Sequence, residues 1–363
     1  MNEISCDNTA GDKKSARKKD RFSRFFRAVK FILFIILLVP FVCWLGGLYE
    51  SASEHNVINR WNHRRFGEFY ELPENSLDLV FIGSSHSYCT FDPEFFDDFF
   101  GINSYQLGMP LQHPDSTYYT LLEVLKTQKP SVVVMELYWD MMGSPFNLKQ
   151  AAALFEVLRD DATVDDYIKN VFPLSEKVKY FFLPIRYQPD FFAYRSSLIL
   201  KCLDETYGLK KQANEIPGEE YYKTGGFIYC TYNIPDEKFT YANQFLNLDG
   251  KKWTFDPVQQ KYVRLIIELC EKNDIRLAFV TAPVANVSME HIKNYGAIHE
   301  QIAKFAREAG VSYIDYNIVN MEENLLTNEN FRDDAHVNYS GAVIVMEHFA
   351  NWLTDVFGNP PWR

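Results

Sequence analysis

An apolar run that ends at a glycine and two serines most constrains what this chain can fold into. Residues 79–82 (LVFI) have the composition of a buried strand, and Gly83, Ser84 and Ser85 follow at once. Unbroken apolar runs of this kind are typical of parallel strands that are covered on both faces. In an open α/β sheet, functional groups gather at the carboxyl ends of the strands. The stretch therefore predicts an α/β sheet with Ser85 as a candidate nucleophile at one strand end.

The rest of the chain supplies the other strands and helices of such a sheet. Alternating strand-like and helix-like segments predict a mostly parallel sheet with right-handed crossovers. We expect a three-layer α/β/α sandwich with a five-stranded sheet. The strands are expected at about 77–83, 102–107, 131–137, 275–282 and 311–316. The helices are expected at about 92–100, 115–127, 262–269, 292–309 and 340–357.

A long segment, at about 141–255, interrupts this alternation between the third and fourth strands. It contains helix-like stretches near 148–158 and 193–207, and a stretch rich in glycine and tyrosine at 225–233. We interpret it as an insertion at the rim of the sheet within a single α/β domain of residues 77–363.

The N-terminal region predicts a membrane anchor. Residues 31–49 are nineteen consecutive residues without a charge, and about twenty apolar residues suffice for a helix to cross the hydrocarbon core. Residues 1–30 carry a net charge of +5 and the remainder −16, so residues 1–30 are expected to form a basic cytoplasmic tail. Residues 50–76 would form a juxtamembrane connector, and the domain would be extracytoplasmic. A cleaved signal peptide is the alternative interpretation.

Charge and cysteine content limit the remaining function classes. The net charge of −11 argues against nucleic acid as a partner, because phosphate binding requires clustered Lys and Arg. None of the six cysteines forms a CxxC pair, so a structural zinc site is not expected and no disulfide is assigned. A metal site built from His86, Glu136, Asp334 and His336 is a weaker alternative, since no ligand spacing supports it. We expect neither a metal nor a cofactor.

Four residues at strand ends and in a late loop have the chemistry of acyl transfer. A serine hydroxyl becomes a good nucleophile when an imidazole accepts its proton and a carboxylate orients that imidazole. Asp333 and His336 stand three positions apart, so one turn can deliver the carboxylate and the base to Ser85 together. The backbone N–H groups of Ser85 and Gly108 would bind the oxyanion.

Three further residues are expected to form the wall of this site: His86, Glu136 and Tyr138. A dyad of Ser85 with the adjacent His86 is disfavoured, because neighbouring side chains at a turn usually diverge. Asn338 and Ser340 are expected to shape the start of the last helix.

These residues resemble the SGNH/GDSL hydrolase superfamily over about 77–363, with the insertion unmatched. By position, Ser85 matches the family nucleophile, Gly108 the glycine of the oxyanion hole, His336 the base and Asp333 its orienter. The anchored form looks like the membrane-tethered branch that includes DltD-like teichoic-acid D-alanylation proteins and alginate O-acetylation proteins. Two departures stand out: Gly-Ser-Ser replaces the usual Gly-Asp-Ser, and Glu136 and Tyr138 stand where Gly-x-Asn-Asp is usual.

The resemblance implies a membrane-anchored acyltransferase or esterase of a bacterial cell membrane. Its acceptor would be a cell-envelope polysaccharide or a teichoic acid, and a multispanning membrane O-acyltransferase would supply the acyl group. An anchored carbohydrate esterase or deacetylase is the alternative, and a non-catalytic scaffold that binds glycan is a third.

Overall fold

The central sheet has five parallel strands. The computed structural model describes residues 9–54, 57–182, 219–233 and 244–362. The strands are β1 (Leu79–Ile82), β2 (Ser104–Gln106), β3 (Val132–Glu136), β6 (Arg276–Thr281) and β7 (Ser312–Asp315). They are ordered β2-β1-β3-β6-β7, and each neighbouring pair is parallel. The predicted five-stranded parallel sheet is therefore confirmed.

The order of the strands reverses between β1 and β3. The chain runs from β1 outward to β2 and then returns past β1 to β3. Such a switch point opens a crevice at the carboxyl ends of the two strands. Gly83 follows β1 and Glu136 ends β3, so both lie at this point.

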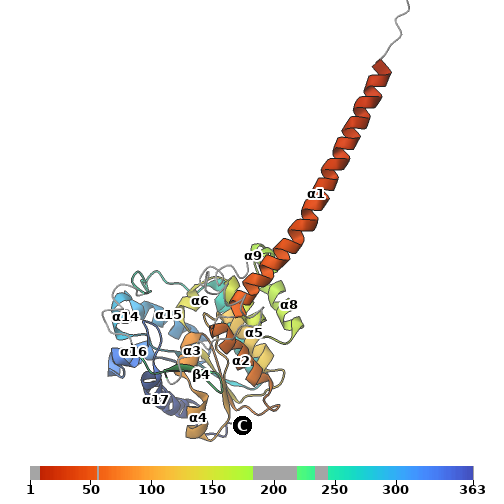
Figure 1. The fold of residues 1–363 in the computed structure, drawn as a ribbon. Helices are drawn as coiled ribbons and strands as arrows, with labels where there is room; N and C mark the ends of the chain where they lie inside the picture. The colour runs from red at the N-terminus through yellow and green to blue at the C-terminus, as the bar shows by residue number, and fades with distance from the viewer. Residues whose placement is uncertain (1–8, 55–56, 183–218, 234–243, 363) are drawn as a thin grey trace, which may run out of the picture.

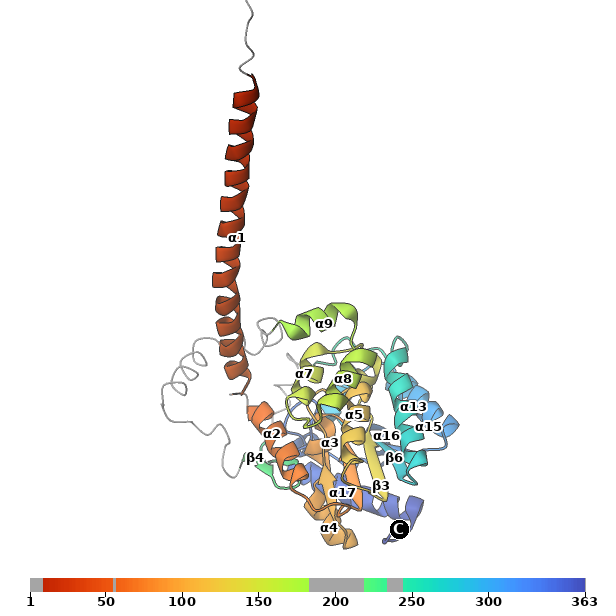
Figure 2. The same ribbon diagram turned by 90° about the vertical axis from the view of Figure 1, so that its right-hand side faces the viewer.

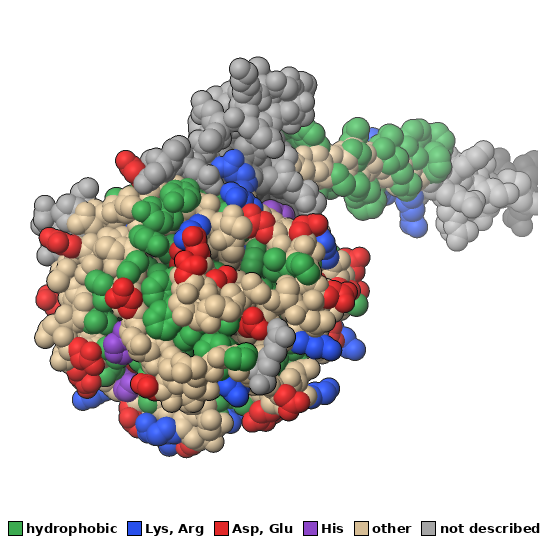
Figure 3. All heavy atoms as spheres, turned by 90° about the horizontal axis from the view of Figure 1, so that it is seen from below, with side chains coloured by type: hydrophobic (Ala, Val, Ile, Leu, Met, Phe, Trp, Pro, Cys, Tyr) green, Lys and Arg blue, Asp and Glu red, His purple; other side chains and the backbone are tan. Residues whose placement is uncertain are grey.

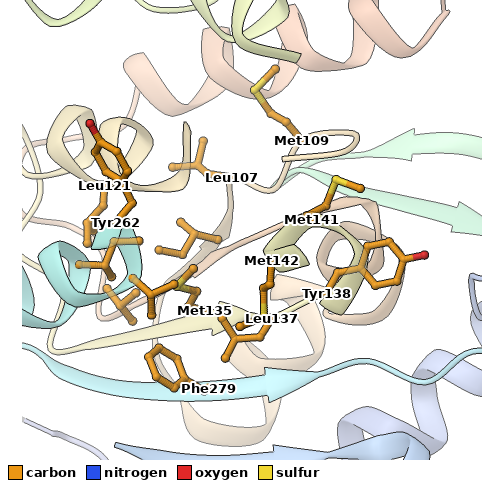
Figure 4. Close-up of a cluster of buried hydrophobic side chains, with 14 of the residues drawn as sticks. Leu107, Met109, Leu121, Met135, Leu137, Tyr138, Met141, Met142, Tyr262 and Phe279 are labelled. Carbon is orange, nitrogen blue, oxygen red and sulfur yellow. The ribbon is translucent and has the colours of Figure 1, made fainter. Parts of the chain in front are cut away.

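Helices cover both faces of the sheet, which makes the domain a three-layer sandwich (Figures 1 and 2). Successive residues of β1 alternate between two apolar clusters, as strand geometry requires. Val80 and Ile82 join the cluster of α5 (Pro114–Val124) and α13 (Pro257–Lys272). Leu79 and Phe81 join the cluster of α4 (Pro93–Phe100) and α17 (Tyr339–Phe357). Figure 4 shows part of the first cluster, with the hydroxyl of Tyr138 directed away from it.

The start of α17 follows the sequence prediction. Asn338 is the N-cap residue, and its side chain accepts a hydrogen bond from the N–H of Gly341 at 3.1 Å. The hydroxyl of Ser340 donates to Asn338 at 2.7 Å. The other helices of the sandwich are α3 (Ser85–Thr90), α14 (Asn286–His291), α15 (Tyr295–Glu308), α16 (Tyr316–Glu323) and the short 3-10 helix η1 (Asn328–Asn330).

One long helix, α1 (Thr9–Glu54), projects from the domain (Figures 1 and 2). Its segment Phe22–Gly47 has 26 residues, and an 18-residue window of it has a mean hydropathy of 2.6 and is not buried against the protein. By length and composition it can cross a membrane, although a signal sequence has the same properties. Figure 3 shows hydrophobic side chains along this helix outside the domain.

Part of the segment expected to be a juxtamembrane connector is a helix of the domain. Residues Val57–Tyr70 form α2, and Phe66 and Phe69 are buried in the cluster that also contains Val80. Arg65 is also buried, and its Nε donates to the carbonyl oxygen of Gly226 at 2.9 Å. The packed domain therefore begins before residue 77. A mostly polar sequence concealed this helix, because only a few of its residues face the core.

The insertion consists, in its described parts, of short helices and a β-hairpin. The helices are α6 (Trp139–Gly143), α7 (Leu148–Phe155), α8 (Asp161–Asn170) and α9 (Leu174–Phe181). The helix expected at 148–158 corresponds to α7, whereas the one expected at 193–207 lies outside the described residues. Strands β4 (Glu220–Lys223) and β5 (Phe227–Cys230) pair antiparallel. The N–H of Gln106 donates to Gly225 of this hairpin at 2.9 Å, which attaches the hairpin to the end of β2.

Candidate active site

The turn after β1 determines where Ser85 lies. Gly83 has a φ of +146°, and a Cβ atom at this position would lie 2.7 Å from Cβ of Glu136. Glycine is therefore required both by the backbone conformation and by the close approach to β3. The side chain of Ser84 caps the next helix by accepting from the N–H of His86 at 3.2 Å. Ser85 consequently occupies the first position of α3, just beyond the carboxyl end of β1.

The side chains of Ser85, His336 and Asp333 form a continuous hydrogen-bonded series. Oγ of Ser85 lies 2.8 Å from Nε2 of His336. Nδ1 of the same ring lies 2.9 Å and 3.0 Å from the two carboxylate oxygens of Asp333. The carboxylate of Asp333 accepts from the N–H at Nδ1, which places Nε2 to accept a hydrogen bond from the Ser85 hydroxyl. Two segments 251 positions apart thus meet in space.

Asp333 is held in its ionised form by its surroundings. Burial alone would raise its pKa, but His336 and the backbone N–H of Ala335 lower the pKa below its ordinary value. The N–H groups of Ala335 and His336 donate to Oδ1 at 2.8 Å and 2.7 Å. Backbone N–H groups of the same turn therefore hold the carboxylate in the position from which it contacts the imidazole.

Two contacts from the insertion hold the loop that carries Asp333 and His336. The guanidinium of Arg332 forms an ion pair with Glu220 of β4. The carboxylate of Asp334 accepts from the backbone N–H of Gln244 at 3.0 Å and from its side-chain amide at 3.2 Å. No pattern in the sequence pointed to Arg332, Glu220 or Gln244, because the two sides of each contact are distant in the chain.

Glu136 contacts the turn formed by Gly83, Ser84 and Ser85 and is buried, with 4% of its surface exposed. Its Oε2 accepts from the N–H of Ser84 at 2.9 Å and from the Ser84 hydroxyl at 2.7 Å. Its Oε1 has no hydrogen-bond partner among the described residues. Burial raises the pKa of Glu136 to about 7, against the lowering effect of the Ser84 hydrogen bonds. Glu136 therefore supports the turn, in a position where a protonated carboxyl can also act as a donor.

The stability of the protein is expected to depend less on pH in a Glu136→Gln variant. Between pH 4.5, the ordinary pKa, and about 7, the folded chain retains a proton that the unfolded chain has released. This group therefore contributes stability below about pH 4.5 that is lost as the pH rises through about 7, on the order of 3 kcal/mol. Thermal unfolding of the full chain in detergent at pH 5 and pH 8 measures the difference. Equal pH dependence in both proteins would contradict the assignment.

The N–H of Gly108 is already hydrogen-bonded. It donates to Oε1 of Gln106 at 2.8 Å, so the structure does not present it as a free oxyanion donor. A Cβ atom at position 108 would lie 2.9 Å from the carbonyl oxygen of Ser84, so glycine permits the close approach of the segment after β2 to the turn that carries Ser85. Gln106 is fully buried and also contacts the hydroxyl of Ser87 at 3.0 Å. Gln106 was not among the predicted site residues. The only sign of it in the sequence is a polar residue at the end of a strand-like run.

His86 and Tyr138 are buried side by side, next to His336. The ring of His86 lies 4.0 Å from the ring of Tyr138 and 4.7 Å from that of His336, between ring centroids. Burial, reinforced by the neighbouring His336, lowers the pKa of His86 well below its ordinary value. His86 is therefore neutral and places no second cation beside His336. The hydroxyl of Tyr138 has no partner among the described residues.

The weaker metal alternative finds no support in the described parts of the chain. They contain no group of three or more His, Cys, Asp or Glu side chains that could hold a metal ion. Cys43, Cys89, Cys230 and Cys270 are free thiols.

The chain is an α/β protein in which the side chains of a serine, a histidine and an aspartate are joined by hydrogen bonds at the switch point of a parallel sheet. No protein-family model and no curated protein matches the chain. Among solved structures it is similar to a candidate acylhydrolase from Bacteroides fragilis NCTC 9343, at 11% identity and a TM-score of 0.37. That match covers 82% of this chain and 97% of the other.

A GDSL-like lipase from Bacteroides thetaiotaomicron VPI-5482 is similar at 10% identity, with a TM-score of 0.38. This match covers 82% of this chain and 98% of the other. Matches of this degree assign neither a family nor an activity to this chain.

Proposed function

We propose that the chain is a membrane-anchored serine acyltransferase of SGNH type that acts outside the cytoplasm. The observation that carries this proposal is the hydrogen bond of 2.8 Å between Ser85 and Nε2 of His336, continued by Asp333 on Nδ1. A serine hydroxyl bonded to an imidazole, which is bonded in turn to a carboxylate, is the arrangement that nucleophilic acyl transfer by a serine requires.

The mechanism proceeds in two half-reactions. Oγ of Ser85 attacks the carbonyl carbon of an ester or thioester, and its proton passes to Nε2 of His336. Asp333 stabilises the imidazolium that forms. The tetrahedral intermediate collapses to an acyl-serine, and the leaving group takes the proton from Nε2. An acceptor hydroxyl then loses its proton to the same nitrogen and attacks the acyl-serine. The second tetrahedral intermediate breaks its bond to Oγ of Ser85, and Oγ takes the proton back from Nε2.

The oxyanion of each tetrahedral intermediate needs donors close to Ser85. The N–H of Ser85 lies in the first turn of α3, where helix N–H groups have no acceptor within the helix. Gly108 would contribute only after Oε1 of Gln106 releases its N–H. A protonated Glu136 is a further source of a proton donor near the turn.

The proposed acceptor is a cell-envelope glycopolymer, either a polysaccharide or a teichoic acid. The apolar segment of α1 supports retention in the cell membrane, with the basic residues 1–30 in the cytoplasm and the domain outside. Because the chain offers one candidate span in its described residues, a multispanning O-acyltransferase would carry the acyl group across the membrane to Ser85.

Envelope polymers isolated from a bacterial strain that encodes Ser85→Ala are expected to lose ester-linked acyl groups. Acyl groups released by mild base are quantified per sugar residue, and an immunoblot of the membrane fraction verifies equal protein levels. A fall in acyl content supports transfer. A rise would replace the proposal by an anchored esterase or deacetylase, and no change would favour a non-catalytic scaffold that binds glycan.

A further inference from the structure

Helix α9 presents its apolar residues to the outside of the protein. Leu174, Val178 and Phe181 are 80%, 69% and 71% exposed. They recur at i, i+4 and i+7, so they lie on one face of the helix. The partly buried residues of α9 include Glu176 and Lys177. A helix that packs on the core of a protein and faces water on its other side has the opposite polarity, because its apolar stripe faces inward.

The polar residues on the inner face of α9 are accommodated by the protein. The ammonium group of Lys177 donates to the carbonyl oxygen of Lys169 at 3.4 Å. Tyr180 packs its ring against Phe155 and Phe172, with centroids 5.5 Å and 5.6 Å apart. These contacts fix the orientation of α9 on the domain, so its apolar face is held outward.

Helix α9 lies at the end of the domain from which α1 projects. Both ribbon views place it at the level of the last turns of α1, whereas α4 and the C-terminus lie at the opposite end (Figures 1 and 2). The candidate span ends at Gly47 and the domain begins with α2 at Val57. Helix α1 continues for seven residues past Gly47, to Glu54, which is a rise of about 10 Å, so a membrane that contains the span lies close to this end of the domain.

We propose that α9 docks on the outer surface of the lipid bilayer, with Leu174, Val178 and Phe181 inserted at the boundary between headgroups and acyl chains. An amphipathic helix binds in the interfacial plane in proportion to the apolar area that it buries there. This inference rests on the membrane anchoring proposed above. Together with α1, α9 gives the domain two attachments to the membrane, which fixes its orientation.

Photo-crosslinking of the full chain in liposomes tests this docking. Phe181 is replaced by the photoreactive residue p-benzoylphenylalanine, and the protein is reconstituted in vesicles of phosphatidylethanolamine and phosphatidylglycerol. Phe99 is the matched control, because it is a 48% exposed phenylalanine on α4 at the opposite end. After irradiation, mass spectrometry is expected to find phospholipid adducts at position 181 at least about tenfold more often than at position 99.

Other outcomes of the crosslinking experiment would overturn the proposal. The proposal fails if position 181 crosslinks to another part of the same chain or to a second copy. It also fails if phospholipid adducts at position 181 are no more frequent than at position 99. The same probe at Val178 serves as a second position, in case the probe at 181 points away from the lipid. Hydrolysis of a small soluble ester by both probe-bearing proteins measures the activity of the serine site independently of the crosslinking. Hydrolysis without lipid adducts would exclude the docking alone, whereas lipid adducts without hydrolysis would exclude only the proposed activity.

Discussion

Replacement of Ser85 by alanine is expected to abolish both ester hydrolysis and labelling by a serine-directed fluorophosphonate. The hydroxyl of Ser85 is 2.8 Å from Nε2 of His336 and is the group that forms the acyl intermediate. Removing the nucleophile of a serine–histidine–aspartate site lowers kcat by about 10⁴- to 10⁶-fold. Hydrolysis of a chromogenic acetyl ester by the detergent-solubilised full chain measures the loss.

Ser87 provides a matched control for this experiment. It lies two positions further along α3, and its hydroxyl hydrogen-bonds with the side chain of Gln106 at 3.0 Å. A Ser87→Ala variant is therefore expected to retain labelling, and peptide mapping should locate the phosphonate on Ser85. If Ser85→Ala hydrolysed the ester at the rate of the unmodified protein, Ser85 would not be the nucleophile.

An Asp333→Asn variant is expected to lose about 10⁴-fold in kcat with little change in KM, because an amide no longer enforces the productive tautomer of the imidazole. Asparagine can still accept the N–H bonds of Ala335 and His336 through Oδ1, so the loop is expected to keep its conformation. The negative charge that stabilises the imidazolium of His336 is lost. Steady-state kinetics across the pH range separate this effect from a change in substrate binding.

Asp334→Asn is the control for Asp333→Asn. Asp334 is adjacent in sequence, but its carboxylate accepts hydrogen bonds from Gln244. Its replacement is expected to change kcat by no more than a few fold. Equal losses in the two variants would mean that the loop tolerates neither substitution, and the orienting role assigned to Asp333 would fail.

The geometry around the candidate nucleophile was predictable because short segments encode it. Gly83, Ser84 and Ser85 follow an apolar run, and Asp333 and His336 share one turn, so each local arrangement follows from nearest neighbours in the chain. The fate of the Gly108 N–H was not predictable, because its acceptor is a side-chain oxygen of Gln106. Sequence patterns specify which backbone groups exist near a strand end, but not which side chain reaches them first.

The fold, too, was predictable only where it depends on local sequence. All five expected strands are present, since apolar runs with β-branched residues determine strands locally. The polar segment expected to be a connector contains helix α2, because a helix needs only a few buried residues, here including Phe66 and Phe69, to attach to a core.

The sequence by itself determined the alternation of strands and helices, the apolar N-terminal span and the residues that could form a serine site. Local periodicity and composition depend on neighbouring residues, so they can be read along the chain. Only the tertiary structure decided the order β2-β1-β3-β6-β7, which places Gly83 against Glu136, and the burial that raises the pKa of Glu136. It also turned the apolar face of α9 outward. These features depend on contacts between distant segments, and only the folded chain brings those segments together.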